Sequence, residues 1–219
     1  MQDDMAALEA VVARYAAKRP TGQTRSEVTT VDDVLDDDER KKIYGFLNRP
    51  GWQFGWKSVP GDDQYSFWHK HFAGHLIVDH MIKEGQQQPY DCDQELKEKA
   101  PIIHQLWRTL KQRELKGHVL VRCYANGQPY GCEGTIHTDS ISHSSYTSVY
   151  YPHDKWQPNW GGETVFFNPE RNDIVASIYP RPNRLVIFPG VIQHVARGVS
   201  RTCPALRITL MFKTECRDG

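Results

Sequence analysis

The stretch RLVIFPGVIQHVARGV, residues 184–199, holds two short runs rich in β-branched and aromatic residues on either side of Pro189 and Gly190. Runs of this length and composition, separated by a Pro-Gly turn signal, are typical of consecutive β-strands. We therefore expect strands over 184–188 and 193–199. His194 falls near the start of the second run among apolar neighbours, where a polar ring needs a partner.

The same pattern continues on both sides of this stretch. Further strands are predicted over 119–124, 145–151, 164–167, 174–178 and 206–212, each bounded by Gly, Pro, Asn or Asp. These runs follow helical segments instead of alternating with them. The sequence therefore predicts an α+β chain with a mainly β core, built as a sandwich or barrel.

The first half of the chain is predicted to be mainly helical. Apolar residues at helical spacing predict helices over 4–18 and 95–115, and the acidic residues of the run 32–41 suit the first turn of a helix that continues to about Leu47. A β-like run occupies 28–31, and the aromatic, histidine-rich residues 52–80 are expected to form a lid or pocket wall. We predict a single domain over 1–219, with helical support and a possible lid in 1–115 and a β core in 116–214.

Composition excludes several classes of function. The 219 residues carry 27 Lys and Arg against 27 Asp and Glu, so no net charge attracts a polyanion, and a dedicated nucleic-acid binder is not expected. No window contains the ~18 to 20 consecutive apolar residues of a membrane span, and the acidic start lacks the pattern of a signal peptide. We expect a cytoplasmic protein with no membrane association. The five cysteines form no CxxC pair, which argues against a disulfide framework or a zinc ribbon.

Two histidines and an aspartate are the candidate metal ligands. In an extended segment His137 and Asp139 project from the same face, because they lie two residues apart. Alone, this pair equally fits an exposed polar turn, and His194 alone fits a hydrogen-bonded core histidine. Together, two histidines and a carboxylate on one face of an octahedral ion leave three positions open, as in non-haem Fe(II) oxygenases. A 2-oxoacid can take two of these positions and dioxygen the third.

Arg207 is the candidate partner of an anion. It lies inside the apolar run 206–212, where an unpaired guanidinium is costly to bury. The distal carboxylate of 2-oxoglutarate requires such a cation, and the forked donors of arginine suit it better than lysine. Thr209, two residues along, shares the face of Arg207 and offers a hydroxyl.

Residues 119–213 resemble the Fe(II)- and 2-oxoglutarate-dependent dioxygenases, specifically their prolyl 4-hydroxylase-like branch. The resemblance is carried by Tyr124, Asn126, His137-Thr138-Asp139, 147–151, Gly161-Gly162-Glu163-Thr164, 182–190, His194 and Arg207. It implies a double-stranded β-helix, that is, a cupin-like jelly roll flanked by N-terminal helices. It also implies that His137, Asp139 and His194 are the catalytic iron ligands, and that Arg207 pairs with the C5 carboxylate of 2-oxoglutarate.

The same resemblance assigns Tyr124 and Tyr151 to the cosubstrate pocket, and we add Thr164 and Thr209 to this cofactor-binding set. The alternation of Thr147, Val149 and Tyr151 favours Tyr151 over Tyr150 as the inward-facing ring. Two departures leave the substrate open. Collagen-type prolyl hydroxylases carry Lys where this chain has Arg207, and the segment between His194 and Arg207 is longer here, with an expected extra loop at 200–204.

The resemblance implies an enzyme that hydroxylates an unactivated C–H bond with Fe(II), 2-oxoglutarate and O2, releasing succinate and CO2, with ascorbate as an optional further cofactor. A small molecule, such as an amino acid or biosynthetic intermediate, is the favoured substrate, because no peptide-binding module is recognisable. A prolyl residue in a peptide is the first alternative. From other classes, a non-catalytic cupin-like metal- or ligand-binding module and a zinc-dependent hydrolase are kept as alternatives.

Two further sets of residues have open roles. The histidines of the 52–80 segment fit either a second metal site or the polar part of a pocket wall; they are His69, His71, His75 and His80. Residues near the expected iron entrance are candidate substrate contacts; they are Arg122, Glu133, Ser140 and His143.

Overall fold

Two antiparallel sheets form the frame of the protein. The computed structural model describes residues 27–59, 66–74 and 91–217. A large sheet has the strand order β1-β8-β5-β10-β4-β3-β2, and a small sheet has the order β7-β6-β9. The strands are β1 (Thr29–Val31), β2 (Gln53–Trp56), β3 (Phe67–Ala73), β4 (His118–Gln128), β5 (Ser145–Tyr151), β6 (Thr164–Phe167), β7 (Ile174–Ile178), β8 (Arg184–Pro189), β9 (His194–Ala196) and β10 (Arg207–Cys216).

Strand β10 is the central element of the large sheet. It pairs with β4 along its whole length and with β5 from Leu210 to Glu215. Successive side chains of a strand point to opposite faces of the sheet. β10 therefore presents Ile208, Leu210 and Phe212 to one side and Arg207, Thr209 and Lys213 to the other.

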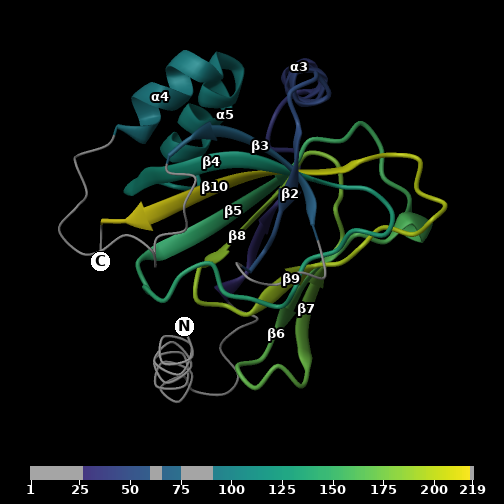
Figure 1. Cartoon of the computed structure of the whole chain (residues 1–219). Coiled ribbons are helices and arrows are strands. Elements are labelled where there is room, and N and C mark those ends of the chain that lie inside the picture. The colour runs from purple at the N-terminus through teal and green to yellow at the C-terminus, as the bar shows by residue number, and fades with distance from the viewer. Residues whose placement is uncertain (1–26, 60–65, 75–90, 218–219) are drawn as a thin grey trace.

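The helices cover the outer face of the large sheet (Figure 1). They are α3 (Asp37–Leu47), α4 (Cys92–Lys99) and α5 (Pro101–Gln112), with a short 3-10 helix, η2, at Pro158–Trp160. The apolar stripe of α5 packs against the outward residues of β10, with the Trp107 ring stacked near Phe212 at 5.9 Å between centroids. This apolar core covers the outer face of β10. The inner face of β10 points into the space between the two sheets.

The inner core lies between the two sheets. Side chains from β4, β5, β6, β8, β10 and the turn after β8 meet there; they are Tyr124, Val149, Tyr151, Phe166, Val186, Phe188, Ile192 and Met211. Figure 1 shows β6, β7 and β9 on the side of the large sheet opposite the helices. Two facing antiparallel sheets with helices outside confirm the expected α+β jelly roll.

The helix predicted over 95–115 is wrong as a single element. Pro101 begins α5, and α4 ends at Lys99 with Ala100 between them. Proline has no N–H for the helical ladder and fits the first turn of a helix, so it starts a second helix instead of continuing the first. The acidic run behaves as expected, because Asp36 caps α3 by accepting from the Glu39 backbone N–H at 2.8 Å.

Strands β2 and β3 occupy much of the segment that is expected to form a lid. They lie within 52–80 and extend the large sheet beyond β4. The first half of the chain therefore contributes three strands as well as helices, where only helical support and one β-like run are predicted. The expected helix over 4–18 and the residues His75 and His80 lie outside the described residues. None of the described helices is long and apolar enough to cross a membrane.

Candidate active site

The backbone brings His137 and His194 together, although they are far apart in the sequence. Each donates its N–H to the carbonyl oxygen of the other, at 3.0 Å from His137 and 2.9 Å from His194. Asp139 is held nearby because its N–H donates to the Gly190 carbonyl at 2.8 Å. The turn after β8 and the start of β9 therefore place all three candidate ligands. Among the described residues, they are the one group whose ligand atoms lie within 4.8 Å of one another.

The imidazole rings are oriented as metal ligands require. His137 Nδ1 lies 2.7 Å from the Thr135 carbonyl oxygen, and His194 Nδ1 lies 2.9 Å from that of Ile192. A carbonyl oxygen only accepts, so each Nδ1 carries the proton and each Nε2 keeps its lone pair. Burial lowers the pKa of His194 to about 4, which keeps its ring neutral at physiological pH.

The Asp139 carboxylate faces both lone pairs. Its Oδ1 lies 3.4 Å from His137 Nε2 and its Oδ2 lies 3.4 Å from His194 Nε2. Neighbouring ligand atoms bonded to one ion at roughly 2.1 Å lie roughly 3 Å apart, so this set fits a single metal ion. Burial alone would raise the pKa of Asp139, but the Lys213 ammonium beside the carboxylate holds this pKa well below its usual range.

Two residues that sequence reasoning missed also contact Asp139. The Lys213 ammonium forms an ion pair with Oδ2, and the Thr147 hydroxyl donates to the same oxygen at 2.6 Å. Lys213 also donates to the Thr147 hydroxyl oxygen at 2.9 Å. A sequence signal exists for Lys213, because it lies six residues after Arg207 in one strand and therefore shares its face.

Arg207 is a fully buried cation, with 1% of its surface exposed. Its guanidinium donates to neutral oxygens, namely the Gly162 carbonyl at 2.6 Å, Gln128 Oε1 at 2.7 Å and the Thr164 hydroxyl at 3.1 Å. No ion pair found among the described residues includes Arg207. Burial lowers its pKa, but an arginine remains charged in a protein, so this site is ready for an anion.

The remaining predicted cofactor residues differ in their position. The Tyr151 hydroxyl lies 2.7 Å from Thr164 Oγ1, and its ring faces the Arg207 guanidinium at 5.8 Å. Tyr150 instead lies in the outer core and donates to Asn183, as the strand alternation predicts. Thr209 is buried on the face of Arg207. No hydrogen bond or ring contact found among the described residues joins Tyr124 to Arg207, and the Tyr124 ring packs beside Arg122 and His69.

Glycine is required beside Arg207. Gly162 has a φ of +82°, which side chains rarely adopt, and a Cβ there would lie 3.0 Å from Arg207 Cδ and 3.1 Å from Val199 Cγ1. Glycine at this position lets the backbone carbonyl approach the guanidinium. The neighbouring Arg207 and Val199 side chains leave no space for a larger residue at position 162.

Strand β6 sets the distance between the two ends of the site. Thr164 contacts Arg207, while Phe166, two residues further on, pairs with His194 and packs on its ring. Two residues of a strand span about 7 Å. The chain of 2-oxoglutarate is about 5 Å long between its carboxylate carbons, from standard bond lengths. One such molecule fits between the arginine and the candidate metal ligands.

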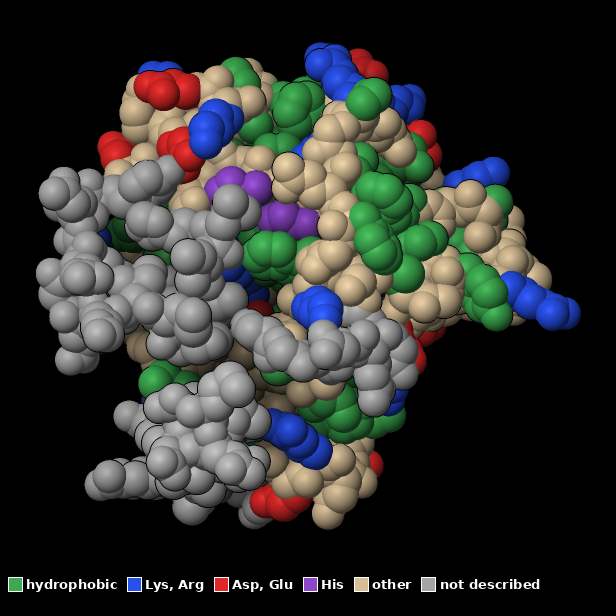
Figure 2. Space-filling model, in the orientation of Figure 1, with side chains coloured by type: hydrophobic (Ala, Val, Ile, Leu, Met, Phe, Trp, Pro, Cys, Tyr) green, Lys and Arg blue, Asp and Glu red, His purple; other side chains and the backbone are tan. Residues whose placement is uncertain are grey.

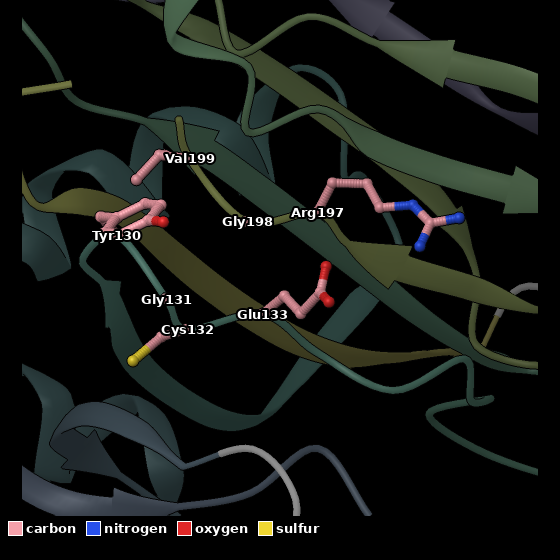
Figure 3. Close-up of a pocket in the computed structure, with 7 residues that line it drawn as sticks. All are labelled: Tyr130, Gly131, Cys132, Glu133, Arg197, Gly198 and Val199. Carbon is pink, nitrogen blue, oxygen red and sulfur yellow. The ribbon is translucent and has the colours of Figure 1, made fainter. Parts of the chain in front are cut away.

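A surface pocket elsewhere contains none of the candidate metal ligands and none of the predicted cofactor-binding residues. It is lined by Tyr130, Gly131, Cys132, Glu133, Arg197, Gly198 and Val199. Figure 3 shows that the Arg197 side chain extends away from the others and that the Cys132 sulfur points away as well. The pocket carries no convergent set of catalytic groups, and Glu133 therefore gains no support as a substrate contact.

Comparison with known proteins shows which family the second half of the chain resembles. Residues 119–212 match the model of the 2OG-Fe(II) oxygenase superfamily. No curated protein matches the chain. A prolyl-4-hydroxylase from Pseudomonas putida is similar in structure, with a TM-score of 0.56 at 17% identity, over 95% of this chain and 98% of that one.

Two further solved structures share the fold. An oxidoreductase of the 2OG-Fe(II) oxygenase family from Burkholderia pseudomallei has a TM-score of 0.63 at 15% identity, over 95% of this chain and 92% of that one. HygX from Streptomyces hygroscopicus, solved with nickel and 2-oxoglutarate, has a TM-score of 0.57 at 11% identity, over 91% and 89%. These likenesses confirm the double-stranded β-helix fold and, at the level of fold, the resemblance to the prolyl 4-hydroxylase-like branch. None of the findings supports ascorbate. Residues 119–212 therefore match the 2OG-Fe(II) oxygenase superfamily, and this match indicates an oxidoreductase that uses Fe(II) and 2-oxoglutarate.

Proposed function

We propose that this protein is a single-domain Fe(II)- and 2-oxoglutarate-dependent hydroxylase of a small molecule. The observation that carries the proposal is the buried Arg207 guanidinium, hydrogen-bonded only to neutral oxygens, at the far end of β6 from His137, Asp139 and His194. A buried cation at one end and a metal-ligand set at the other match a cosubstrate with a carboxylate at one end and a chelating 2-oxoacid at the other.

The residues have separate roles in this proposal. His137, Asp139 and His194 hold Fe(II), with Thr135 and Ile192 fixing the histidine tautomers through their carbonyl oxygens. When bound, Fe(II) with 2-oxoglutarate and O2 supplies the oxidant that removes a hydrogen atom from an unactivated C–H bond, with release of succinate and CO2.

The anion end of the site is built around Arg207. This residue provides the charge, and the Thr164 and Tyr151 hydroxyls extend the hydrogen-bonding surface around it. Burial raises the pKa of Tyr151, so its phenol keeps its proton and can donate to a carboxylate. Thr209 shares the face of Arg207, and Tyr124 lies one strand further across the same inner surface.

The apolar walls exclude water from the reacting centre. Phe188 packs on the His194 ring at 4.7 Å between centroids and meets Phe166 at 4.9 Å. A dry site strengthens each electrostatic contact inside it and protects a reactive species from water. On the other side of the candidate ligands, Asp139 contacts the polar side chains of Lys213 and Thr147. This side of the site is therefore polar.

The test is a product search with Fe(II), 2-oxoglutarate and air. Free amino acids and small metabolites are supplied in one set of reactions and proline-containing peptides in another, and mass spectrometry seeks a gain of one oxygen atom. We expect an oxygenated small molecule in the wild type and none in His194→Ala. Oxygenation confined to the peptide set contradicts the small-molecule assignment, and a zinc-dependent hydrolysis product contradicts the oxygenase assignment.

A further inference from the structure

A second polar cluster lies on the inner face of the large sheet, on β2, β3 and β4. We call it the histidine cluster and define it as Trp56, His69, His71, Arg122 and Tyr124. His71 on β3 is directly opposite Tyr124 on β4, and Arg122 on β4 is directly opposite Lys213 on β10. Figure 2 shows histidine side chains reaching this face beside hydrophobic ones, over the region of β2, β3 and β4.

The two histidines present unused acceptors. His71 Nε2 lies 2.8 Å from the Gly74 carbonyl oxygen, and His69 Nδ1 lies 3.3 Å from Asn126 Oδ1. Because these oxygens accept, the other nitrogens, His71 Nδ1 and His69 Nε2, carry lone pairs. Both atoms are buried, and neither has a partner in the part of the chain that the structure describes.

This arrangement is costly unless a ligand completes it. His69 is only 3% exposed, and burial lowers its pKa to about 4 and also lowers the pKa of His71. Both rings are therefore neutral, and a buried acceptor without a partner costs about 1 to 3 kcal/mol. The lone pairs call for N–H or O–H donors from a bound molecule.

Arg122 adds a positive charge beside these acceptors. Its guanidinium stacks over the Tyr124 ring at 4.6 Å and adds to the effect of burial in lowering the pKa of both histidines. No hydrogen bond or ion pair found among the described residues involves it. A metal ion or a simple amine is disfavoured next to this charge, whereas a carboxylate is favoured. The cluster thus matches a carboxylate with an adjacent hydrogen-bond donor.

The aromatic members give the cluster a flat wall. The Trp56 ring stacks on His69 with 3.9 Å between centroids and an interplanar angle of 11°, and the Tyr124 ring lies beside both, at 5.1 Å from His69 and 6.3 Å from Trp56. Tyr124 also belongs to the inner core that contains Phe166 and Phe188, the two rings packed on His194. Strands lie ~4.8 Å apart, so His69 and His71 on β3 lie two strand spacings, about 10 Å, from β10, whereas Arg122 on β4 lies directly opposite Lys213.

We propose that the histidine cluster binds the head group of a free α-amino acid, with its carboxylate on Arg122 and its ammonium N–H groups on His69 and His71. The side chain then extends toward the candidate metal ligands. This inference rests on the proposed function and names its substrate class. Binding energy from a remote head group is the means by which an enzyme orients a C–H bond at the reacting centre.

Binding without turnover tests this inference. The chain is loaded with Zn(II) in place of Fe(II) and with 2-oxoglutarate, and each of the common free amino acids is titrated by calorimetry. Binding by at least one of them is expected. Its N-acetyl and carboxamide forms should each bind at least about tenfold more weakly, because each removes one half of the zwitterion.

Variants separate the cluster from the cosubstrate site. Arg122→Gln and His71→Ala should each weaken amino-acid binding at least about tenfold and leave 2-oxoglutarate binding unchanged. Arg108→Gln, at an exposed position of α5, is the matched arginine control and should change neither. His71 is only half-buried, so His71→Ala should leave the protein folded. This variant therefore still tests amino-acid binding if a change at Arg122 or His69 disturbs folding.

The outcomes that overturn the inference are distinct from failure of the proposed function. Absence of binding by every free amino acid overturns it, as does equal binding of peptides with blocked ends or a loss of 2-oxoglutarate affinity alone in Arg122→Gln. Amino-acid binding that depends on Arg122, in a chain that forms no succinate with Fe(II), supports the cluster and contradicts the oxygenase.

Discussion

Replacing Arg207 by methionine should abolish tight binding of 2-oxoglutarate while leaving the protein folded. Three of the five guanidinium N–H groups are used by Gly162, Gln128 and Thr164, so two (5 − 3 = 2) are left for a ligand. Hydrogen bonds to a charged group contribute about 1.5 to 3 kcal/mol each, and removing one partner of a buried pair costs about 3 to 5 kcal/mol. At about 1.4 kcal/mol per tenfold, this predicts a rise in Kd of roughly two to three and a half orders of magnitude.

Calorimetric titration of 2-oxoglutarate into the Zn(II)-loaded protein measures this change directly. Arg207→Lys keeps the charge but loses the fork, so its affinity should fall between those of the wild type and Arg207→Met. Arg108→Met, on the exposed side of α5, serves as the control and should bind like the wild type. Circular dichroism and the thermal midpoint show whether each variant is folded.

A folded Arg207→Met variant whose Kd lies within tenfold of the wild type refutes this reasoning. In that case the cosubstrate carboxylate binds elsewhere, and the buried guanidinium serves only to link Gly162, Gln128 and Thr164. In that case β6 does not separate an anion site from the candidate metal ligands.

Three more changes have defined outcomes. Gly162→Ala should weaken 2-oxoglutarate binding at least about tenfold in calorimetry, because the new methyl group displaces the Arg207 side chain or strains the backbone at φ +82°; unchanged affinity contradicts the close packing seen there. Lys213→Met should destabilise the metal-free protein by about 3 to 5 kcal/mol in urea unfolding, because it leaves the Asp139 charge buried without its partner. Added metal should then stabilise this variant more than it stabilises the wild type. Equal stabilisation of both proteins by the metal contradicts the idea that Lys213 and the metal neutralise the same Asp139 charge. Burial lowers the pKa of His153 from 6.5 to about 3, so this ring takes up a proton only on unfolding and stability falls as pH drops from about 6.5 toward 3. In His153→Gln the free energy of unfolding should fall less steeply with decreasing pH, by about 1.4 kcal/mol per pH unit between pH 6 and 4. Equal pH dependence of this free energy in both proteins contradicts the lowered pKa of His153.

The strands of the jelly roll could be predicted because local signals agree with the tertiary structure. β5, β6 and β7 have the predicted bounds, since β-branched and aromatic residues fill each run and turn residues flank it. β4 and β10 extend beyond their predicted ends by several residues. Most of their extra residues are polar, and the pairing between the two strands holds them in the sheet without an apolar pattern.

Strands β2 and β3 could not be inferred in the same way. Their residues include a glycine, a lysine and two histidines, and register shifts interrupt their pairing. Their inward side chains form a polar and aromatic wall instead of an apolar core, so the usual alternation is absent. The helix break at Pro101 is different, because a proline at that position is a local signal that predicts a new helix start.

The residue types of the candidate site were accessible from sequence, but its contacts were not. The spacing of His137 and Asp139 predicts a shared face, whereas the reciprocal hydrogen bonds between His137 and His194 depend on how two distant segments meet. Lys213 illustrates the limit. Lys213 lies an even number of residues from Arg207 in the same strand, which places it on the inner face. Its ion pair with Asp139 depends also on where the turn that carries Asp139 lies, and the sequence does not give this position.

The most direct test of the account is the formation of succinate from 2-oxoglutarate under air by the Fe(II)-loaded protein. Succinate should form only with Fe(II), should disappear in His137→Ala and should fall in Arg207→Ala, while Arg108→Ala behaves as the wild type. Pooled free amino acids should stimulate it more than proline-containing peptides. Absence of succinate in a folded, metal-binding wild-type protein under all of these conditions contradicts the oxygenase and favours a binding module built on the same barrel.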